Sequence, residues 1–293
     1  MENLILVAGA TGNLGQKICR ELIKRNVNVR AIVRENGNAE KLGVLEKMGV
    51  EILKLDFSNQ QQLISACTGV SCVVSALAGL RDVIIDVQTE LLDAAIAAGV
   101  QHFIPSDFSS DFTAMPEGEN RNFDLRKEFM EKIDSSRIMA TSIFNGCFAD
   151  ILRYNTPLFN VPDQTIAYFG DKADWKIDFT TMDDTAAFTA LVALDDKAPR
   201  SLKIASFSVS PNDLVQMSEQ SKGSRFKLVK MGTMEEFSAT NKLLRAADSA
   251  GENTLYPKWQ QAQYLYSMFF VHHGTLDNDR YEGLQWSVVT ENI

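Results

Sequence analysis

The chain has 293 residues, 45% of them hydrophobic, which is enough for the core of one large α/β domain or of a domain with a smaller lobe. Its net charge is −9 and it has no basic stripe, which argues against nucleic acid and anionic membrane surfaces as partners. The four cysteines lack metal-ligand spacing, no apolar run reaches the ~18 residues of a membrane helix, and no secretory leader pattern is present, so we expect a cytoplasmic protein without bound metal.

The first half of the chain alternates short β-branched runs with amphipathic segments. Strands are predicted at 4–9, 28–33, 50–56, 72–77 and 102–106. Helices are predicted between them at 13–26, 39–49, 58–69 and 82–99, and three of these end at glycine. Repeated strand–helix–strand units of this length predict an α/β fold with a parallel sheet and helices on both faces.

The regular alternation weakens in the second half. The polar stretch 107–122 is long for a connection, which is typical of a functional loop or lid. The remaining predicted elements are helices at about 123–134, 183–195 and 211–222, a C-terminal helical region, and strands at 139–145, 165–170, 176–181 and 201–208. We expect a first domain over 1–150 and a smaller, interleaved α/β lobe over 151–293, with late elements from about 177–222 returning to the first domain.

Three glycines lie between the first strand and the first helix. Gly9 permits a tight turn out of the strand, Gly12 lets the backbone approach a pyrophosphate, and Gly15 lets the helix pack closely. The N–H groups at the start of the helix then face an anion. The predicted phosphate-binding residues are Gly9, Thr11, Gly12, Asn13, Leu14 and Gly15. The alternative is a tight turn that binds no ligand.

The end of the second strand indicates which dinucleotide is bound. Dinucleotide-binding sheets that prefer NAD carry an acidic residue there, whereas an arginine accommodates the 2′-phosphate of NADP. Here the strand ends in Arg34, and Lys41 supplies a second cation if the loop folds back. We therefore expect NADP(H), although Glu35 is adjacent and Arg34 has a simpler interpretation as a solvated strand end.

The next two strands end in residues suited to line the same crevice. Asp56 and Phe57 are predicted to contact the adenine, and Ala76 and Leu77 to lie beside the dinucleotide, because open α/β sheets bind ligands at the carboxyl ends of their strands. Each of these residues is also compatible with ordinary packing.

Several stretches together resemble one family. These are "GATGNLG" (9–15), "AIVR" (31–34), "IIDVQTELLDAAIAAGVQHFIPSDF" (84–108), "IDFTTMDDTAAFTALVAL" (177–194) and a late "NDLVQMSE" helix. In this order they are similar to isoflavone reductase-like and NmrA-like proteins, which are atypical short-chain dehydrogenases. The resemblance implies a Rossmann-like domain that binds NADPH and a cleft beneath a small C-terminal lobe.

The resemblance also implies catalytic and nicotinamide-side residues. The family's reductases use a lysine on the helix after the "PSEF" loop. A gapless placement puts Arg126 in that position and Lys127 one residue later. Lys127 is the candidate proton donor, with a solvated helix-face charge as the alternative, and Arg126 is a candidate cofactor or anion contact. The remaining candidates for the nicotinamide end are Ser106, Asn145 and Phe148.

Two functions follow as expectations. The first is an NADPH-dependent oxidoreductase that reduces a small carbonyl, quinone or enone under the C-terminal lobe by hydride transfer. The alternative is a non-catalytic NADP(H)-binding redox sensor or transcriptional regulator of the NmrA type, with a protein partner at the cleft. The adjacent His272 and His273 have no further ligands at metal spacing, so no metal site is predicted.

Overall fold

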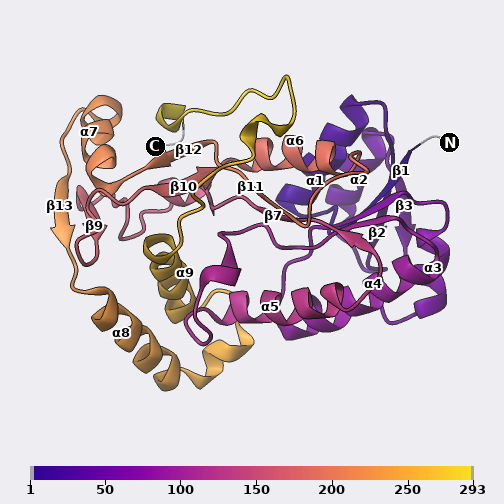
Figure 1. Cartoon of the computed structure of the whole chain (residues 1–293), viewed down its shortest axis with the longest axis horizontal. Helices are drawn as coiled ribbons and strands as arrows, with labels where there is room; N and C mark the ends of the chain where they lie inside the picture. Colours follow the sequence, from indigo (N-terminus) through magenta and orange to yellow (C-terminus); the bar gives the residue numbers. More distant parts are fainter. Residues whose placement is uncertain (1–2, 292–293) are drawn as a thin grey trace.

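A computed structural model describes residues 3–291 of the chain (Figure 1). Its main sheet is parallel, with the strand order β3-β2-β1-β4-β5-β6. The strands are β1 (Leu4–Ala8), β2 (Asn28–Val33), β3 (Glu51–Lys54), β4 (Cys72–Ser75), β5 (His102–Ile104) and β6 (Met139–Ala140). The order reverses between β1 and β4, which is the Rossmann arrangement and opens a crevice at the carboxyl ends of these two strands.

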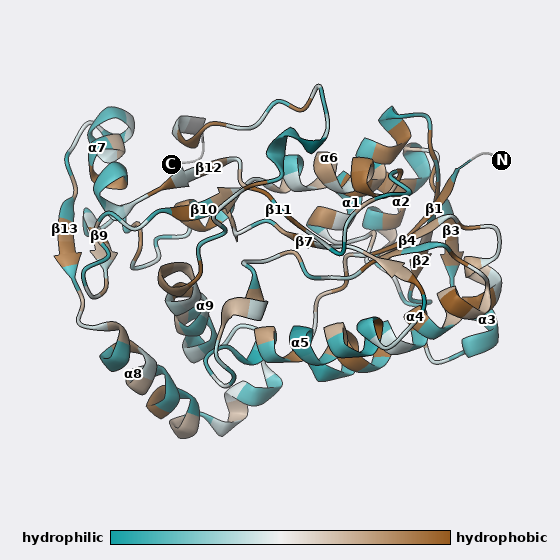
Figure 2. Ribbon diagram, in the orientation of Figure 1, coloured by the Kyte–Doolittle hydropathy of each residue, from teal (hydrophilic) through white to brown (hydrophobic). Residues whose placement is uncertain are grey.

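Helices cover both faces of this sheet, as the alternating side chains of β1 require. Ile5 and Val7 pack with α1 (Asn13–Lys24) and α6 (Met182–Val192). Leu6 and Ala8 point to the opposite face of the sheet and belong to a second core cluster. That face carries α3 (Gln60–Cys67), α4 (Gln88–Ala97) and α5 (Arg121–Asp134), while α2 (Ala39–Lys47) lies beside β3. Figure 2 shows the resulting hydrophobic strands between helices with hydrophilic outer faces. The predicted Rossmann-like α/β fold is confirmed.

The predicted single strand 139–145 is wrong, because the chain changes sheets at Thr141. The Thr141 N–H still donates to Phe103 in the main sheet, whereas the next N–H, of Ser142, donates to Arg200. The second piece, β7 (Ser142–Phe144), therefore pairs with β11 (Ser201–Lys203). The predicted strand 201–208 is likewise divided, into β11 and β12 (Phe207–Val209).

The second half of the chain forms a smaller lobe around its own aromatic core. One sheet has the order β12-β10-β8, with β10 (Ile177–Thr180) between β12 and β8 (Cys147–Phe148). A pair formed by β9 (Thr165–Tyr168) and β13 (Lys227–Lys230) packs against α7 (Pro211–Lys222). Helices α8 (Met234–Ala247) and α9 (Lys258–Phe270) pack on each other. Short 3₁₀ segments complete the lobe and its connections: η2 (Phe112–Ala114), η3 (Ala149–Arg153), η4 (Ser249–Asn253), η5 (Asn278–Arg280) and η6 (Val289–Glu291).

The two halves of the chain are interleaved. Helix α6 lies against α1 (Figure 1), and β11 pairs with β7, whereas α7 packs on the smaller lobe. The boundary near residue 150 stays a prediction. Among residues 3–291, none of the helices combines the length and apolar character that crossing a bilayer requires.

Candidate functional site

The glycine turn holds three pieces of backbone in contact. Gly9 has φ +79°, and a Cβ there would lie 2.4 Å from the carbonyl oxygen of Ala76 at the end of β4. A Cβ on Gly15 would lie 2.2 Å from the Gly9 oxygen, and the Gly12 N–H donates to that same oxygen at 2.9 Å. Because no side chain fits at Gly9 or Gly15, the spacing of this motif is dictated by close packing of the turn, β4 and α1.

The N-terminus of α1 is open. Gly12 is its N-cap residue and supplies no side chain to the N–H groups of the first turn, and no acidic residue occupies that turn. A Cβ on Gly12 would meet only the Gly9 oxygen within 4 Å, at 3.2 Å, so the space beyond it is clear. Thr11, Asn13 and Leu14 flank this opening with at least partial exposure. Uncapped N–H groups and a helix dipole suit an anion, which is the fit a pyrophosphate requires.

Two basic side chains lie beyond the carboxyl end of β2. Arg34 directly follows the strand and Lys41 lies in the first turn of α2, after a turn in which the Gly37 N–H donates to the Arg34 carbonyl. Both side chains are exposed, and within residues 3–291 neither lies within 4.0 Å of a carboxylate. Glu35 is also exposed and, among residues 3–291, forms no ion pair with Arg34.

Asp56 and Phe57, which follow β3, differ in their exposure to solvent. Asp56 is exposed, and its carboxylate accepts a 2.9 Å hydrogen bond from the Ser58 N–H, which lowers the pKa of that carboxyl. Phe57 is half-buried and packs against the apolar core under α3. Asp56 therefore places a charged carboxylate after the carboxyl end of β3, and Phe57 beside it is partly exposed.

The ends of β4 and β5 are joined by a buried amide. Gln88, at the start of α4, accepts hydrogen bonds from the Ser75 hydroxyl at 2.7 Å and from the Ser106 N–H at 3.1 Å. The Ser106 hydroxyl donates to the Leu77 carbonyl. Ala76 and Leu77 are partly exposed, as expected for residues along a crevice. Sequence reasoning assigned no role to Gln88, although a polar residue on the apolar face of a helix was a usable signal.

The side chains of Arg126 and Lys127 donate hydrogen bonds to different segments of the chain. The guanidinium of Arg126 donates to the Ser106 carbonyl at 3.0 Å and to the Asn122 carbonyl at 2.9 Å. The ammonium of Lys127 donates to the carbonyl of Met115, in the stretch between β5 and α5. Neighbouring side chains on a helix point about 100° apart, which accounts for the divergence. Of the two, it is Arg126 that is bonded to the end of β5.

The stretch 107–122 is packed into the molecule, and α5 begins two residues earlier than predicted. Phe112 and Met115 are buried with Phe144 and Tyr266 in one apolar cluster. Asp107 is buried and accepts a 2.7 Å hydrogen bond from the Ser142 hydroxyl. Burial raises the pKa of Asp107 to about 6, against the opposing effects of that hydroxyl and of nearby arginines.

Asn145 is an unsatisfied amide at the end of β7. Its side chain is 0% exposed, and neither its oxygen nor its nitrogen has a hydrogen-bond partner among residues 3–291. A buried amide without partners costs free energy, so it points to a ligand or water at this position. Phe148, in β8, is half-buried and packs against the core that also contains α1 and α6.

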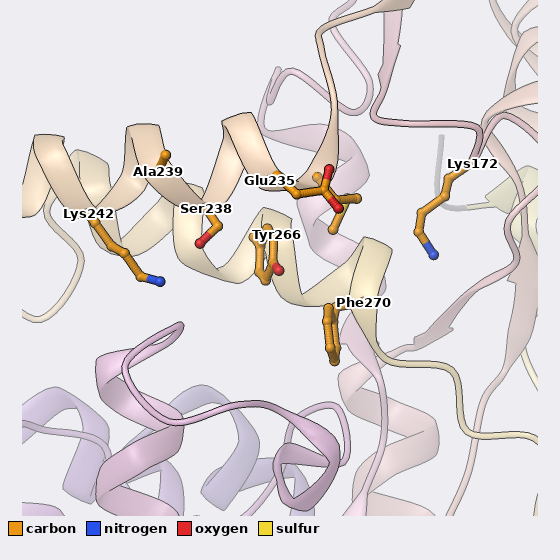
Figure 3. Close-up of a pocket in the computed structure, with 8 residues that line it drawn as sticks. Lys172, Glu235, Ser238, Ala239, Lys242, Tyr266 and Phe270 are labelled. Carbon is orange, nitrogen blue, oxygen red and sulfur yellow. The ribbon is translucent and has the colours of Figure 1, made fainter.

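A cavity of about 570 Å³ lies between α8 and α9 (Figure 3). Tyr266 and Phe270 of α9 form its apolar wall, and Lys172 and Lys242 stand at opposite ends. The full lining consists of Lys172, Met234, Glu235, Ser238, Ala239, Lys242, Tyr266 and Phe270. Tyr266 also belongs to the cluster with Phe144, the residue before Asn145. No local sequence pattern predicts this cavity, because its walls come from separate elements. Across residues 3–291, no three His, Cys, Asp or Glu side chains are placed to hold a metal ion.

Known proteins match this chain over most of its length. The profile of the NmrA-like family matches residues 1–287. Pinoresinol reductase 1 of Arabidopsis thaliana is 30% identical over 274 residues, which cover 86% of this chain and 84% of that protein.

Solved structures share the fold across the whole chain. AtPrR2 with NADP+ and (+)-pinoresinol has a TM-score of 0.80 at 24% identity, covering 99% of this chain and 97% of that one. The leucoanthocyanidin reductase–NADPH complex of Vitis vinifera has a TM-score of 0.81 at 18% identity, with the same coverage of both chains. Because the family profile matches residues 1–287, this chain belongs to the NmrA-like family.

Proposed function

We propose that this protein is an NADP(H)-dependent reductase. The observation that carries the proposal is the open N-terminus of α1 behind the glycine turn, on the same sheet edge as two exposed cations, Arg34 and Lys41. The relatives support it, since they include a pinoresinol reductase and solved complexes with NADP+ or NADPH. In this assignment the turn holds the pyrophosphate, and the cations hold the 2′-phosphate.

The other crevice residues follow the dinucleotide along the sheet edge. Asp56 and Phe57 would contact the adenine, and Ala76, Leu77 and Ser106 would line the path to the nicotinamide. Arg126, Asn145 and Phe148 would surround the nicotinamide end. The unsatisfied amide of Asn145 supports this, because a carboxamide offers both the donor and the acceptor that its side chain lacks.

The chemistry is the reduction of a carbonyl, quinone or enone. When bound, NADPH supplies a hydride. As the hydride adds to the substrate, negative charge develops on the substrate oxygen, and Arg126 is a fixed cation suited to stabilise it. The ammonium of Lys127 then donates the proton that completes the hydroxyl, after it leaves the Met115 carbonyl.

The substrate is proposed to be small and apolar or aromatic, held beneath the C-terminal lobe. The aromatic wall of the α8–α9 cavity supports this class, since Tyr266 and Phe270 offer ring surfaces beside the polar groups of Glu235 and Ser238. The apolar cluster containing Tyr266 and Phe144 connects that wall to the segment carrying Asn145.

Titration with NADPH and NADH, followed by an assay with quinones, aldehydes and enones, tests the proposal. We expect NADPH to bind at least tenfold more tightly than NADH and to be oxidised in the presence of at least one substrate class. Tighter binding of NADH would overturn the 2′-phosphate assignment.

A non-catalytic NADP(H) sensor is the second candidate. One observation favours it: Arg126, which cannot readily release a proton, is held by two carbonyls, and the gapless placement assigns it to the family's lysine position. A sensor would discriminate between NADP+ and NADPH in affinity without oxidising NADPH. A reductase would turn over, so parallel affinity and turnover measurements separate the two functions.

A further inference from the structure

Gln88 is a fully buried polar side chain with every polar atom engaged. It is 0% exposed and lies at the start of α4. Its oxygen accepts from the Ser75 hydroxyl and the Ser106 N–H, and its nitrogen donates to the Ile84 carbonyl at 2.9 Å. A glutamine so placed is specific, because no other uncharged side chain of this length supplies one acceptor and one donor in these directions.

The helix is distorted where Gln88 enters it. Residues Asp82–Val87 form a π-helical turn, and the Gln88 N–H donates to the Val83 carbonyl, five residues earlier. The side-chain nitrogen of Gln88 takes up the Ile84 carbonyl in this widened turn. Such π turns are rare and occur frequently at functional sites.

The contacts of Gln88 run toward the reacting end of the proposed site. Ser75 is the last residue of β4, and Ser106 follows β5. The carbonyl of Ser106 in turn holds Arg126, and its hydroxyl holds the Leu77 carbonyl. One amide oxygen therefore fixes the separation of two strand ends and, through Ser106, the place of Arg126.

We propose that Gln88 is a positioning residue of the cofactor crevice: it holds the carboxyl ends of β4 and β5 at the separation that places Leu77, Ser106 and Arg126 around the nicotinamide. This inference rests on the proposed NADP(H) function. Gln88 touches neither substrate nor cofactor and acts through the two serines.

The test uses Gln88→Glu and Gln88→Met, with NADPH affinity measured by fluorescence titration between pH 5 and 9. A protonated glutamic acid reproduces both contacts of the amide, since its hydroxyl donates to Ile84 and its other oxygen accepts from the serines. Once ionised, the glutamate places a carboxylate oxygen next to the Ile84 carbonyl oxygen and is a buried charge. Because burial disfavours the ionised form, it raises the pKa of this glutamate. Methionine fills the same space without either contact.

We expect Gln88→Glu to bind NADPH within twofold of the wild type at pH 5 and at least tenfold more weakly at pH 9. Gln88→Met is expected to be at least tenfold weaker at every pH. The matched control is Gln101→Glu, on an exposed side chain whose nitrogen donates to the Gly99 carbonyl, and it should follow the wild type throughout.

Folding is monitored by circular dichroism at each pH, and Ser75→Ala is the milder variant if the others unfold. It removes one of the two donors to Gln88, and we expect a three- to tenfold loss of affinity. If the Gln88 variants fold and bind NADPH like the wild type at all pH values, the positioning role alone is overturned. If they unfold, wild-type binding by Ser75→Ala has the same consequence. A wild-type protein that binds no NADPH would overturn the proposed function and this inference with it.

Discussion

The guanidinium of Arg126 donates a 3.0 Å hydrogen bond to the carbonyl of Ser106, which ties helix α5 to the carboxyl end of β5. A second hydrogen bond, to Asn122 within α5, keeps the guanidinium in place. A lysine has no planar set of donors and holds two carbonyls less rigidly. In the proposed function the gapless placement assigns Arg126 to the family's lysine position, and these two hydrogen bonds hold it at the end of β5.

Replacing Arg126 by alanine should lower kcat/KM at least tenfold, or about 1.4 kcal/mol of transition-state stabilisation. The cause is twofold, because the cation is lost and the Ser106 carbonyl loses a donor. Arg126→Lys should recover part of the loss if charge matters more than geometry. Steady-state kinetics with a substrate found in the assay of quinones, aldehydes and enones measures both, and Lys132→Ala, on an exposed position of the same helix, is the control.

Lys127→Ala should lower kcat while leaving the affinity for NADPH within twofold, since the proposed role of Lys127 is proton donation and not cofactor binding. Lys127→Arg should not restore kcat, because arginine does not release its proton readily. The measurement is kcat across pH together with an NADPH titration. Unchanged kcat in Lys127→Ala would remove this residue from the mechanism and strengthen the sensor alternative.

Arg34→Ala should weaken NADPH binding at least tenfold and leave NADH binding unchanged, because only NADPH carries the 2′-phosphate. The loss should shrink at high salt, since Arg34 is exposed and its interaction is screened. Arg20→Ala, an exposed arginine on α1, serves as the control. Equal losses for the two dinucleotides would contradict the assignment of Arg34.

Local sequence predicted the N-terminal half well because each of its elements has a clear period and boundary. All five predicted strands are present, and the glycine turn opens α1 as expected. The predicted strands 139–145 and 201–208 are wrong in extent. At Thr141 the partner strand changes, and no local pattern indicates which strand a residue will pair with.

Residues that act through tertiary contacts were the hardest to assign. Gln88 lies in the stretch 84–108, where no local pattern gives it a role, because its partners Ser75 and Ser106 are 13 and 18 residues away. The divergence of Arg126 and Lys127 depended on the start of α5, which is set by the Asn120 side chain accepting from the Phe123 N–H.

The pH dependence of stability should carry a contribution from Asp107. Its pKa in the folded protein is about 6 because of burial, compared with ~3.9 when unfolded. Between these values the folded state binds more protons, so stability falls as pH rises, by about 3 kcal/mol in total from this group. This contribution is complete below pH ~4 and is lost above pH ~6.

Thermal unfolding of the wild type and Asp107→Asn isolates this effect. The asparagine variant should gain several degrees in Tm relative to the wild type as pH rises from 4 to 7, and the difference should level off above that. A constant difference across this range would show that Asp107 does not titrate there.

The glycine turn offers a test in which stability and cofactor affinity should fall together. In Gly9→Ala the new Cβ would lie 2.4 Å from the Ala76 oxygen at φ +79°, a conformation that costs an alanine about 1–2 kcal/mol before any clash. We expect a loss of at least 2 kcal/mol in unfolding free energy and at least tenfold in NADPH affinity, because the turn must move away from β4 to accept the methyl group.

Gly43→Ala is the matched control: Gly43 is inside α2 with nothing within 4 Å of the added Cβ, so the change should stabilise the helix by about 0.5–1 kcal/mol and leave NADPH binding intact. Denaturant unfolding and NADPH titration on both variants measure the pair. A Gly9→Ala protein as stable and as tightly binding as the wild type would mean that β4 does not constrain the turn.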